Sequence, residues 1–361
     1  MNTTYIEMFP GFSIESIRLF CAIGNFMGDF SYYIDHVHFV VPILGAFLGL
    51  IHLTVLTRKC MRTLGINIFL IGIAIADMIR SISINFTPFF YLRYLSNEVL
   101  CLYPNSTLSY NISASSVKIS EALSIWFGVA IAVIRSLVMR YPVNNRINRL
   151  TQVEYSLKII ITITMFAFPI WALYYTKLCS AKVPGWMPFT NCHRFSENST
   201  KISIDFQINR LFGSTLIYEI DLLIEGVLLE LIPSIILPIT TIGLVKDLKE
   251  AQKNSMSIKS STKSHDTLRS IKLVTFMTIS FLFTTTPHGL MYVIGMFNTD
   301  KPGLVMIILK FARLFTFLTT LNGIAHILIC YLMSTQYRNT ANEVFGEGRK
   351  IFKPTSLVHP T

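Results

Sequence analysis

Residues 119–142 read ISEALSIWFGVAIAVIRSLVMRYP, and this stretch decides the fold class. It is apolar for most of its length, and a helix rising about 1.5 Å per residue would cross a bilayer within it. Arg135 lies inside the stretch, and Pro142 ends it. A charged residue at membrane depth costs roughly 2.5–3.5 kcal/mol, so it is usually functional or paired. An arginine that only snorkels to the interface is the alternative that this stretch leaves open.

The composition of the whole chain is that of a membrane protein with several spans. Of its 361 residues, 52% are hydrophobic and 14% are charged, whereas a typical soluble domain has about 25% charged residues. The net charge is +11, but the basic residues lie between apolar segments and form no basic stripe interleaved with aromatic residues. This distribution favours a lipid bilayer as partner and argues against nucleic acid.

Seven apolar segments of membrane-spanning length follow one another along the chain. We expect them at about 37–57, 66–92, 114–139, 155–176, 220–245, 271–297 and 303–333. Internal prolines predict kinks, which membrane helices tolerate when neighbouring groups satisfy the freed carbonyls. The sequence therefore predicts an all-α membrane protein with a seven-helix domain at 37–333, an N-terminal segment at 1–36 and a tail at 334–361.

Two independent signals orient these spans. Lysine and arginine gather in the tail and after the first, third and fifth spans, which the positive-inside rule places in the cytoplasm. Glycosylation sequons on the opposite side begin at Asn2, Asn105, Asn111 and Asn198. We therefore expect a multi-pass glycoprotein of the plasma membrane with its N-terminus extracellular and its C-terminus cytoplasmic.

This topology also sorts the cysteines. Four of them fall outside, where disulfides persist, namely Cys21, Cys101, Cys179 and Cys192. Cys60 and Cys330 fall inside, where thiols stay reduced. A bridge from Cys101 to Cys192 would tie the long loop after the fourth span to the third span, but four cysteines allow three pairings.

Polar side chains inside the spans indicate a shared interior site. Asp77, Ser124, Asn322 and His326 all fall at membrane depth. Because buried polar groups in lipid must find partners, we expect these residues to turn inward to one wet cavity. Separate hydrogen bonds between helices are the alternative.

The order and spacing of these features resemble those of rhodopsin-like G-protein-coupled receptors. TRKCMRTLGIN (57–67), IRSLVMRYP (134–142), IPSIILPITT (232–241) and LNGIAHILICYLMSTQYRNT (321–340) resemble more closely the nematode class W serpentine receptors. These receptors are similar to receptors for FMRFamide-type neuropeptides. The resemblance, over about 37–345, implies a receptor and not an enzyme. It implies activation by an extracellular neuropeptide, or by a small environmental molecule as the alternative, and coupling to a heterotrimeric G protein.

The resemblance also implies roles for particular residues. Arg135 matches the arginine that meets the G protein in the active receptor, and Arg140 and Pro142 complete that end of the third span. Pro233 and Pro287 match the kinks of the fifth and sixth helices. The remaining matches are a polar pocket that holds a sodium ion in many relatives (Asp77, Ser124, Asn322), the outer disulfide (Cys101, Cys192) and the start of a short amphipathic helix on the inner leaflet (Ser334 to Arg338).

The chain departs from the pattern of these receptors at two places that control activation. Ile134 stands where the residue before the arginine is acidic, so Arg135 lacks the restraint of a neighbouring carboxylate. We therefore expect higher basal activity than in relatives that have the acidic residue. In the seventh span, His326, Ile327 and Cys330 replace the Asn, Pro and Tyr of N-P-x-x-Y.

Charged residues in the outer halves of the spans are the candidates for ligand binding. Lys118 and Glu121 lie three residues apart in the third span and can pair with each other. Glu121 and Glu225 are placed to meet a cationic group, such as the arginine of an RF-amide peptide. Internal pairing of these glutamates with Lys118 and Arg313 is the alternative.

Two other function classes fit the sequence less well. A transporter or channel would be expected to show internal repeats or matched broken spans, and we find neither. An intramembrane enzyme would need a catalytic motif, but H-E-x-x-H and G-x-S-x-G are both absent. His52, His288 and His326 lie in three different spans, a distribution more typical of packing than of a metal site. A sodium ion is therefore the one cofactor we consider.

Overall fold

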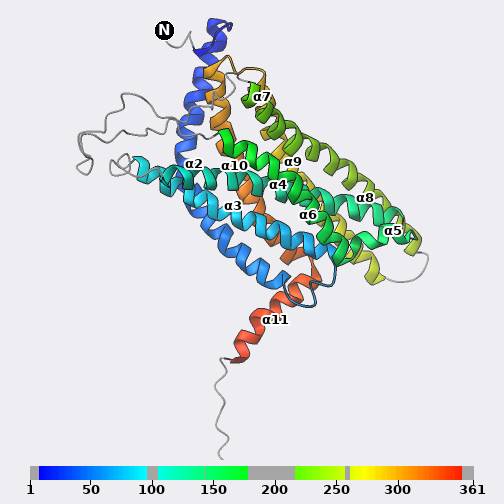
Figure 1. Ribbon diagram of the computed structural model, residues 1–361. Coiled ribbons are helices and arrows are strands. Elements are labelled where there is room, and N and C mark those ends of the chain that lie inside the picture. The colour runs from blue at the N-terminus through cyan, green and yellow to red at the C-terminus, as the bar shows by residue number, and fades with distance from the viewer. Residues whose placement is uncertain (1–7, 96–104, 142, 178–215, 257–260, 352–361) are drawn as a thin grey trace, which may run out of the picture.

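The computed structural model describes residues 8–95, 105–141, 143–177, 216–256 and 261–351. Within these residues the regular elements are all helical (Figure 1). The long helices are α2 (Ile14–Leu56), α3 (Gly65–Leu95), α4 (Asn105–Arg140), α6 (Val153–Lys177), α8 (Ile232–Met256), α9 (Ser261–Met296) and α10 (Pro302–Met333). The shorter elements are α5 (Asn145–Asn148), the 3-10 helix η1 (Arg149–Thr151), α7 (Leu216–Leu223), the π-helix η3 (Ile224–Leu231) and α11 (Thr335–Ile351). The all-α class predicted from the sequence is confirmed.

Every predicted span corresponds to a helix, with α7, η3 and α8 together forming the fifth. Four stretches of the described residues are long and apolar enough to cross a membrane, namely Gly65–Phe86, Ile112–Arg140, Ile224–Glu250 and Pro302–Leu332. Val40–Leu56 of α2 is a shorter apolar stretch. These helices make the chain a multi-pass membrane protein.

The first helix extends well beyond the predicted membrane span. We expected a span from about residue 37, but α2 begins at Ile14 and continues without a break to Leu56. Charged residues interrupt the apolar pattern here, yet Glu15, Arg18 and Asp29 are all exposed and lie on the outer surface of the helix. The apolar stretch Val40–Leu56 agrees with the predicted span, and the helix extends before it as an amphipathic segment, which has no continuous apolar run.

Packing against α10 explains why this early part of α2 is helical. Phe9, Ile17 and Ile307 form a buried hydrophobic cluster. The Lys310 ammonium donates a hydrogen bond of 2.7 Å to the carbonyl oxygen of Gly24. The first turn is capped by the hydroxyl of Ser13, which accepts from the backbone N–H of Ser16.

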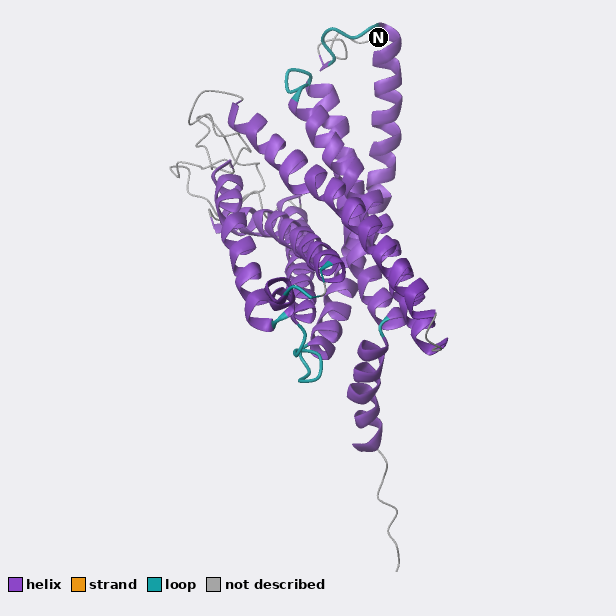
Figure 2. Ribbon diagram, turned by 90° about the vertical axis from the view of Figure 1, so that its right-hand side faces the viewer, coloured by secondary structure: helices purple, strands orange, loops and turns teal. Residues whose placement is uncertain are grey.

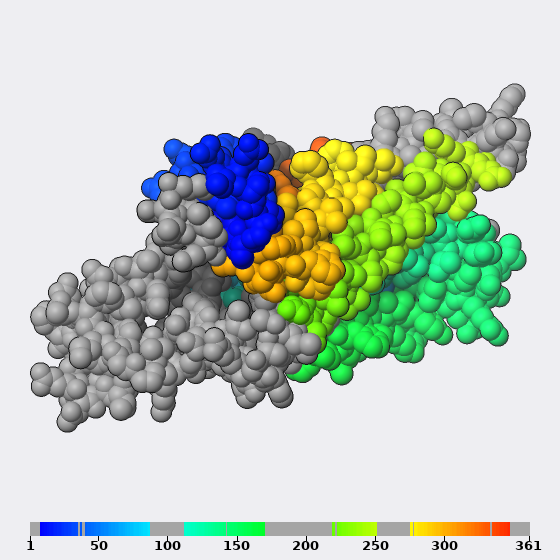
Figure 3. All heavy atoms as spheres, turned by 90° about the horizontal axis from the view of Figure 1, so that it is seen from above, coloured from blue at the N-terminus to red at the C-terminus, as the bar shows by residue number. Residues whose placement is uncertain are grey.

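The helices pack around α4, which contacts α3, α6, α8 and η3. On the other side of α3, α2 contacts both α3 and α10, and α9 contacts α8, η3 and α10. Seen from above, the N-terminal part of α2 lies beside the orange α9–α10 segment, and the yellow-green η3–α8 segment follows (Figure 3). The start of α2 lies at one end of the bundle and α11 at the opposite end (Figure 2). We refer to these as the N-terminal end and the α11 end.

The predicted amphipathic helix after the seventh span is confirmed as α11. Tyr337, Thr340 and Ala341 are buried and share one face, since they are three or four residues apart. Tyr337 and Ala341 pack with Val55 and Leu56 of α2 in a hydrophobic cluster. The helix is therefore fastened to the bundle as well as being amphipathic.

Several predicted residues fall outside the described part of the chain. These are the disulfide partners Cys101 and Cys192, the sequons at Asn2 and Asn198, and Pro142. Asn105 and Asn111 lie within α4. Among the described cysteines, Cys21, Cys60 and Cys330 are free thiols.

Candidate functional site

A cavity of about 330 Å³ lies inside the bundle, with walls from α3, α4, α8, α9 and α10. It extends from Glu121 to Tyr337 of α11. Its wall includes the interior residues expected from the sequence, Asp77, Ser124, Asn322 and His326, together with Arg135. We call it the arginine cavity, and the structure brings the polar residues of three predicted spans together there.

Asp77 pairs with a residue that the sequence analysis did not select. Arg80 lies one turn further along α3, and its guanidinium Nη2 is 3.4 Å from the Asp77 carboxylate. The same nitrogen donates a hydrogen bond of 3.0 Å to the carbonyl oxygen of Thr319 in α10. Gly323 gives the pair its room, because a Cβ there would lie 3.1 Å from Arg80 Nη2 and 3.3 Å from Asp77 Oδ2.

The predicted sodium ligands do not fit a sodium ion well. Asp77 is the carboxylate of that set, and the positive charge beside it is already supplied by Arg80, which is buried. Asn322 is engaged elsewhere, because its Oδ1 accepts a 2.5 Å hydrogen bond from Ser280 of α9. A second cation at Asp77 would be repelled by the guanidinium at close range. The fold therefore assigns the charge-balancing role to Arg80.

Arg135 faces the arginine cavity with no carboxylate partner in the described part of the chain. Its neighbour Ile134 is buried in a hydrophobic cluster with Phe69, Ile73 and Phe127. The position that is acidic in the receptors this chain resembles thus contributes to packing between helices. Arg140 is exposed at the end of α4.

A second polar group includes Glu121, at the edge of the arginine cavity, and extends from there toward the N-terminal end of the bundle. It consists of Lys118 and Glu121 of α4, Glu225 and Glu230 of η3, and His288 and Tyr292 of α9, and we call it the glutamate cluster. Lys118 Nζ lies 3.6 Å from Glu225 and 2.5 Å from the Tyr292 hydroxyl. All three carboxylates are buried. Three of the predicted ligand-binding residues therefore meet in one cluster, whereas Arg313 is exposed on α10.

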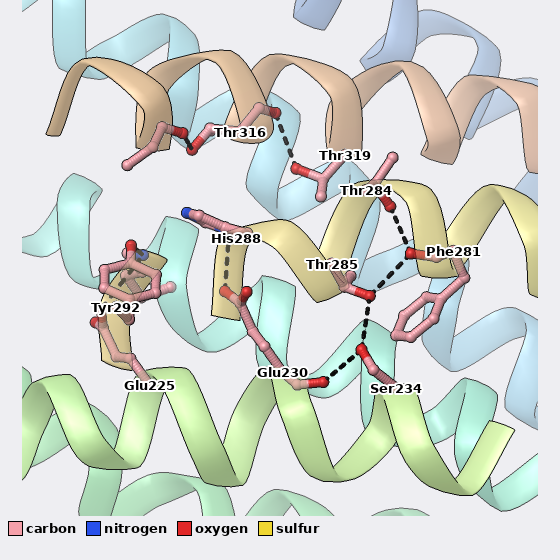
Figure 4. Close-up of polar contacts among 12 residues, drawn as sticks. Glu225, Glu230, Ser234, Phe281, Thr284, Thr285, His288, Tyr292, Thr316 and Thr319 are labelled. Atoms are coloured by element: carbon pink, nitrogen blue, oxygen red, sulfur yellow. Dashed lines mark hydrogen bonds and ion pairs between the residues drawn. The ribbon is translucent and has the colours of Figure 1, made fainter. Parts of the chain in front are cut away.

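The π-helix explains how two glutamates five residues apart face the same neighbour. In an α-helix, residues at this spacing point about 140° apart. The wider i→i+5 turn of η3 reduces this divergence, so Glu225 and Glu230 both project toward α9 (Figure 4). Pro233 is the second residue of α8, just after η3, and it has no N–H to donate to the preceding turn. The π-helix therefore lies immediately before one of the prolines that the sequence predicted to distort the fifth span.

His288 occupies the centre of the glutamate cluster. It is fully buried, and its Nδ1 lies 2.9 Å from a carboxylate oxygen of Glu230. Figure 4 shows the imidazole of α9 lying above Glu230, with Tyr292 on the next turn. Below it, Ser234 donates to the Glu230 carbonyl oxygen at 2.7 Å and lies 3.2 Å from the Thr285 hydroxyl, which joins α8 to α9.

Negative charge in the glutamate cluster exceeds what its partners satisfy. One oxygen of Glu121 and one of Glu230 are buried without a hydrogen-bond partner. Three carboxylates share one lysine and one histidine. A buried carboxylate oxygen left unsatisfied is costly, so the cluster favours a bound group that carries positive charge or hydrogen-bond donors.

A comparison with family models identifies the class to which the chain belongs. The model of the serpentine type 7TM GPCR chemoreceptor Srw matches residues 36–348, which is most of the chain. The chain belongs to the Srw family. Comparison with individual curated proteins gives no match. The class W resemblance read from the sequence is therefore confirmed, and this Srw chain is a serpentine chemoreceptor of the GPCR type.

Sequence reasoning missed Arg80, Glu230 and His288 as members of the interior sites of this Srw receptor. Arg80 carried a signal, since a second charge one turn from Asp77 in the same apolar span indicates an i,i+3 pair. Glu230 carried no such signal, because α-helical periodicity separates it from Glu225. His52 and His326 come from different spans and pack against each other, with their ring centroids 6.0 Å apart.

Proposed function

We propose that this Srw receptor binds an extracellular ligand with a cationic group at the glutamate cluster and activates a heterotrimeric G protein at its α11 end. The observation that carries the proposal is Arg135, a guanidinium in a cavity that extends to α11 and has no carboxylate partner among the described residues. A charged group at membrane depth without a partner is a functional residue by default.

A cationic ligand is favoured by the charge of the glutamate cluster. Glu121 and Glu230 each keep a buried oxygen without a hydrogen-bond partner, and a guanidinium or ammonium group supplies the missing donors. An amidated neuropeptide of the FMRFamide type carries such a group in its arginine. We therefore take such a peptide as the first candidate ligand, with the plasma membrane as the site of action.

A small environmental amine is the second candidate. The family is described as chemoreceptors, which favours small molecules from outside the animal. An amine would satisfy the same carboxylates with a single charge. The two candidates differ in size, so peptide and amine panels distinguish them directly.

Coupling at the α11 end rests on the position of Arg135 and on the charges of the loops there. Arg58, Lys59 and Arg62 follow α2 at this end and are exposed, as the positive-inside rule expects of cytoplasmic loops. With Ile134 in the place of an acidic neighbour, no adjacent carboxylate restrains Arg135. We therefore expect measurable activity without ligand.

The proposal is tested by GTP exchange on purified heterotrimeric G proteins with the receptor in lipid nanodiscs. We expect exchange without ligand, an increase with peptides ending in Arg-Phe-amide or with an amine, and loss of both in Arg135→Ala. Arg18→Ala, an exposed arginine at the N-terminal end, is the matched control and should behave as wild type. Exchange that survives Arg135→Ala, or is absent for every G protein and ligand tried, overturns the coupling proposal.

Ligand binding at the glutamate cluster is tested separately, with a variant of Glu121. Glu121→Gln keeps the shape of the side chain and removes its charge, so the potency of a cationic ligand should fall at least about ten-fold. Glu219→Gln on α7 is the control, because this carboxylate lies outside the glutamate cluster and contacts Thr299. Unchanged potency in Glu121→Gln would contradict binding at this cluster and leave G-protein coupling standing.

A further inference from the structure

The α11 side of the bundle contains a group of side chains that the proposed receptor function does not use. His52 of α2 and His326 and Cys330 of α10 place one imidazole nitrogen each and the thiol sulfur within 4.8 Å of one another. His52 is 1% exposed and Cys330 is 7% exposed, so water has little access to them. We call this group the His–Cys cluster.

Two nitrogens of this cluster are buried without partners. Nε2 of His52 and Nε2 of His326 make no hydrogen bond. A buried polar atom left unpaired costs roughly 1–3 kcal/mol, so two of them side by side favour a bound partner such as a metal ion or a water molecule. Both nitrogens lie on rings that pack edge to face.

The other nitrogen of His52 is held by a residue outside the cluster. Its Nδ1 lies 2.7 Å from the Tyr337 hydroxyl of α11. Histidines that bind metals usually engage their second ring nitrogen in this way, which fixes the ring and directs the free nitrogen at the metal. Tyr337 thus already performs the orienting role that a metal site requires.

We propose that His52, His326 and Cys330 bind a zinc ion. Two imidazoles and a thiolate are a typical zinc donor set, whereas calcium and magnesium select oxygen ligands. His326 and Cys330 are four residues apart, so one turn of α10 presents both on the same face. A tetrahedral site separates its ligand atoms by about 3.4 Å, which small rotamer changes reach from the present spacing.

The space beside the cluster is large enough for a water ligand. A small cavity of about 10 Å³, the size of one water, is bordered by His52 and His326 together with Asp77 and Arg80. The larger arginine cavity is lined by His326 and Cys330, and a water molecule in either space would complete the coordination. The Cys330 thiolate supplies negative charge that offsets the ion, whereas the Asp77 carboxylate is already paired with Arg80. Zinc binding replaces the proton of the Cys330 thiol, which is released to solvent.

The other buried group with metal-binding residue types is a weaker candidate. Glu121, Glu230 and His288 also lie within 4.8 Å of one another. There, however, His288 already faces the Glu230 carboxylate at 2.9 Å, and the same carboxylates belong to the proposed ligand site.

Zinc at the His–Cys cluster would join α2 to α10 and, through Tyr337, to α11. Cys330 and Arg135 line the same cavity, so the ion would fix the end of α10 next to the proposed coupling residue. Zinc should therefore raise the thermal midpoint of the receptor. This binding does not depend on the ligand or on the G protein proposed above.

The experiment uses the purified full-length receptor and two metals. Cobalt(II) serves as the spectroscopic probe, because a thiolate ligand gives a sulfur-to-metal charge-transfer band in the near ultraviolet. Zinc affinity is then measured by displacement of cobalt. We expect the band in wild type, its loss in Cys330→Ser, and its retention in Cys60→Ser, which removes an exposed thiol from the same end of the molecule.

Further variants keep the proposal falsifiable if Cys330→Ser folds poorly. Cys330→His should still bind zinc without the charge-transfer band, and Tyr337→Phe should weaken zinc binding by about 10–100-fold. A wild-type receptor that shows no charge-transfer band overturns the proposal. So does zinc binding that survives Cys330→Ser and disappears in His288→Gln, which would place the metal at the glutamate cluster.

Discussion

Gly226 of η3 and Gly289 of α9 bring two helix backbones into direct contact. A Cβ built on either glycine would lie 3.0 Å from the carbonyl oxygen of the other. Small residues allow this approach in membrane helices, where close packing replaces the hydrophobic effect as the main force between helices. His288 precedes Gly289 in the chain, and the side chain of Glu230 packs against Gly289. The helix crossing therefore brings Glu230 beside His288.

Alanine at Gly226 or Gly289 should therefore destabilise the receptor by about 1–3 kcal/mol, since the added methyl group has no room. Thermal unfolding of the purified protein in detergent measures the effect. Gly243→Ala on α8 is the control, because its Cβ would meet only Ser136 Oγ at 3.6 Å, an ordinary contact. Equal midpoints for all three variants would show that the helices do not approach as described.

The ion pair between Lys118 and Glu225 predicts an asymmetric pair of variants. Glu225 is buried and Lys118 is 24% exposed, so Lys118→Met leaves a carboxylate without its cation inside the bundle. We expect about 2 kcal/mol of destabilisation, less than for a fully buried pair. Adding Glu225→Gln should restore most of the loss. A double variant no more stable than Lys118→Met would mean that the two side chains do not interact.

The pairing of Asp77 with Arg80 predicts how the receptor responds to salt. Because a guanidinium already balances the Asp77 carboxylate, sodium chloride and N-methylglucamine chloride at equal concentration should give the same thermal midpoint. Arg80→Gln should lower the midpoint in both salts. A midpoint that rises only in sodium and loses this rise in Asp77→Asn would restore the sodium site that the resemblance implied.

The docking of α11 on α2 predicts that the same substitution has different effects on stability at two neighbouring positions of α11. Ala341 is 2% exposed against α2, whereas Asn342 is exposed. Ala341→Glu would bury a charge in the cluster with Val55 and Leu56, and should detach α11 or unfold the receptor. Asn342→Glu should change the free energy of unfolding by no more than about 0.5 kcal/mol. Similar behaviour of both variants would show that α11 lies free of the bundle.

The sequence predicted the helices well because apolar length is a strong signal in membrane proteins. It predicted the interior cavity from a second signal, because polar residues such as Asp77 and Asn322 cannot face lipid. It did not predict that α2 begins at Ile14, well before the apolar stretch, because burial of this early part depends on contacts with α10 rather than on hydropathy. Long-range packing of this kind leaves no local pattern in the sequence.

The interior sites were predicted less completely than the helices. Periodicity assumes 3.6 residues per turn, so it could not bring Glu230 to the same face as Glu225 across a π-helix. It also gave no means of pairing His52 with His326, which are brought together by the packing of α2 on α10. The missing information was a local change of helix type in the first case and the packing of one helix on another in the second.

We propose above all that the α11 end, with Arg135 in its cavity, faces the cytosol while the N-terminal end faces outside. Antibody access to epitope tags at the two chain ends, in intact and then permeabilised cells, tests it most directly. We predict that the N-terminal tag is stained on intact cells and the C-terminal tag only after permeabilisation. Staining of both tags on intact cells, or of the C-terminal tag alone, would contradict the account.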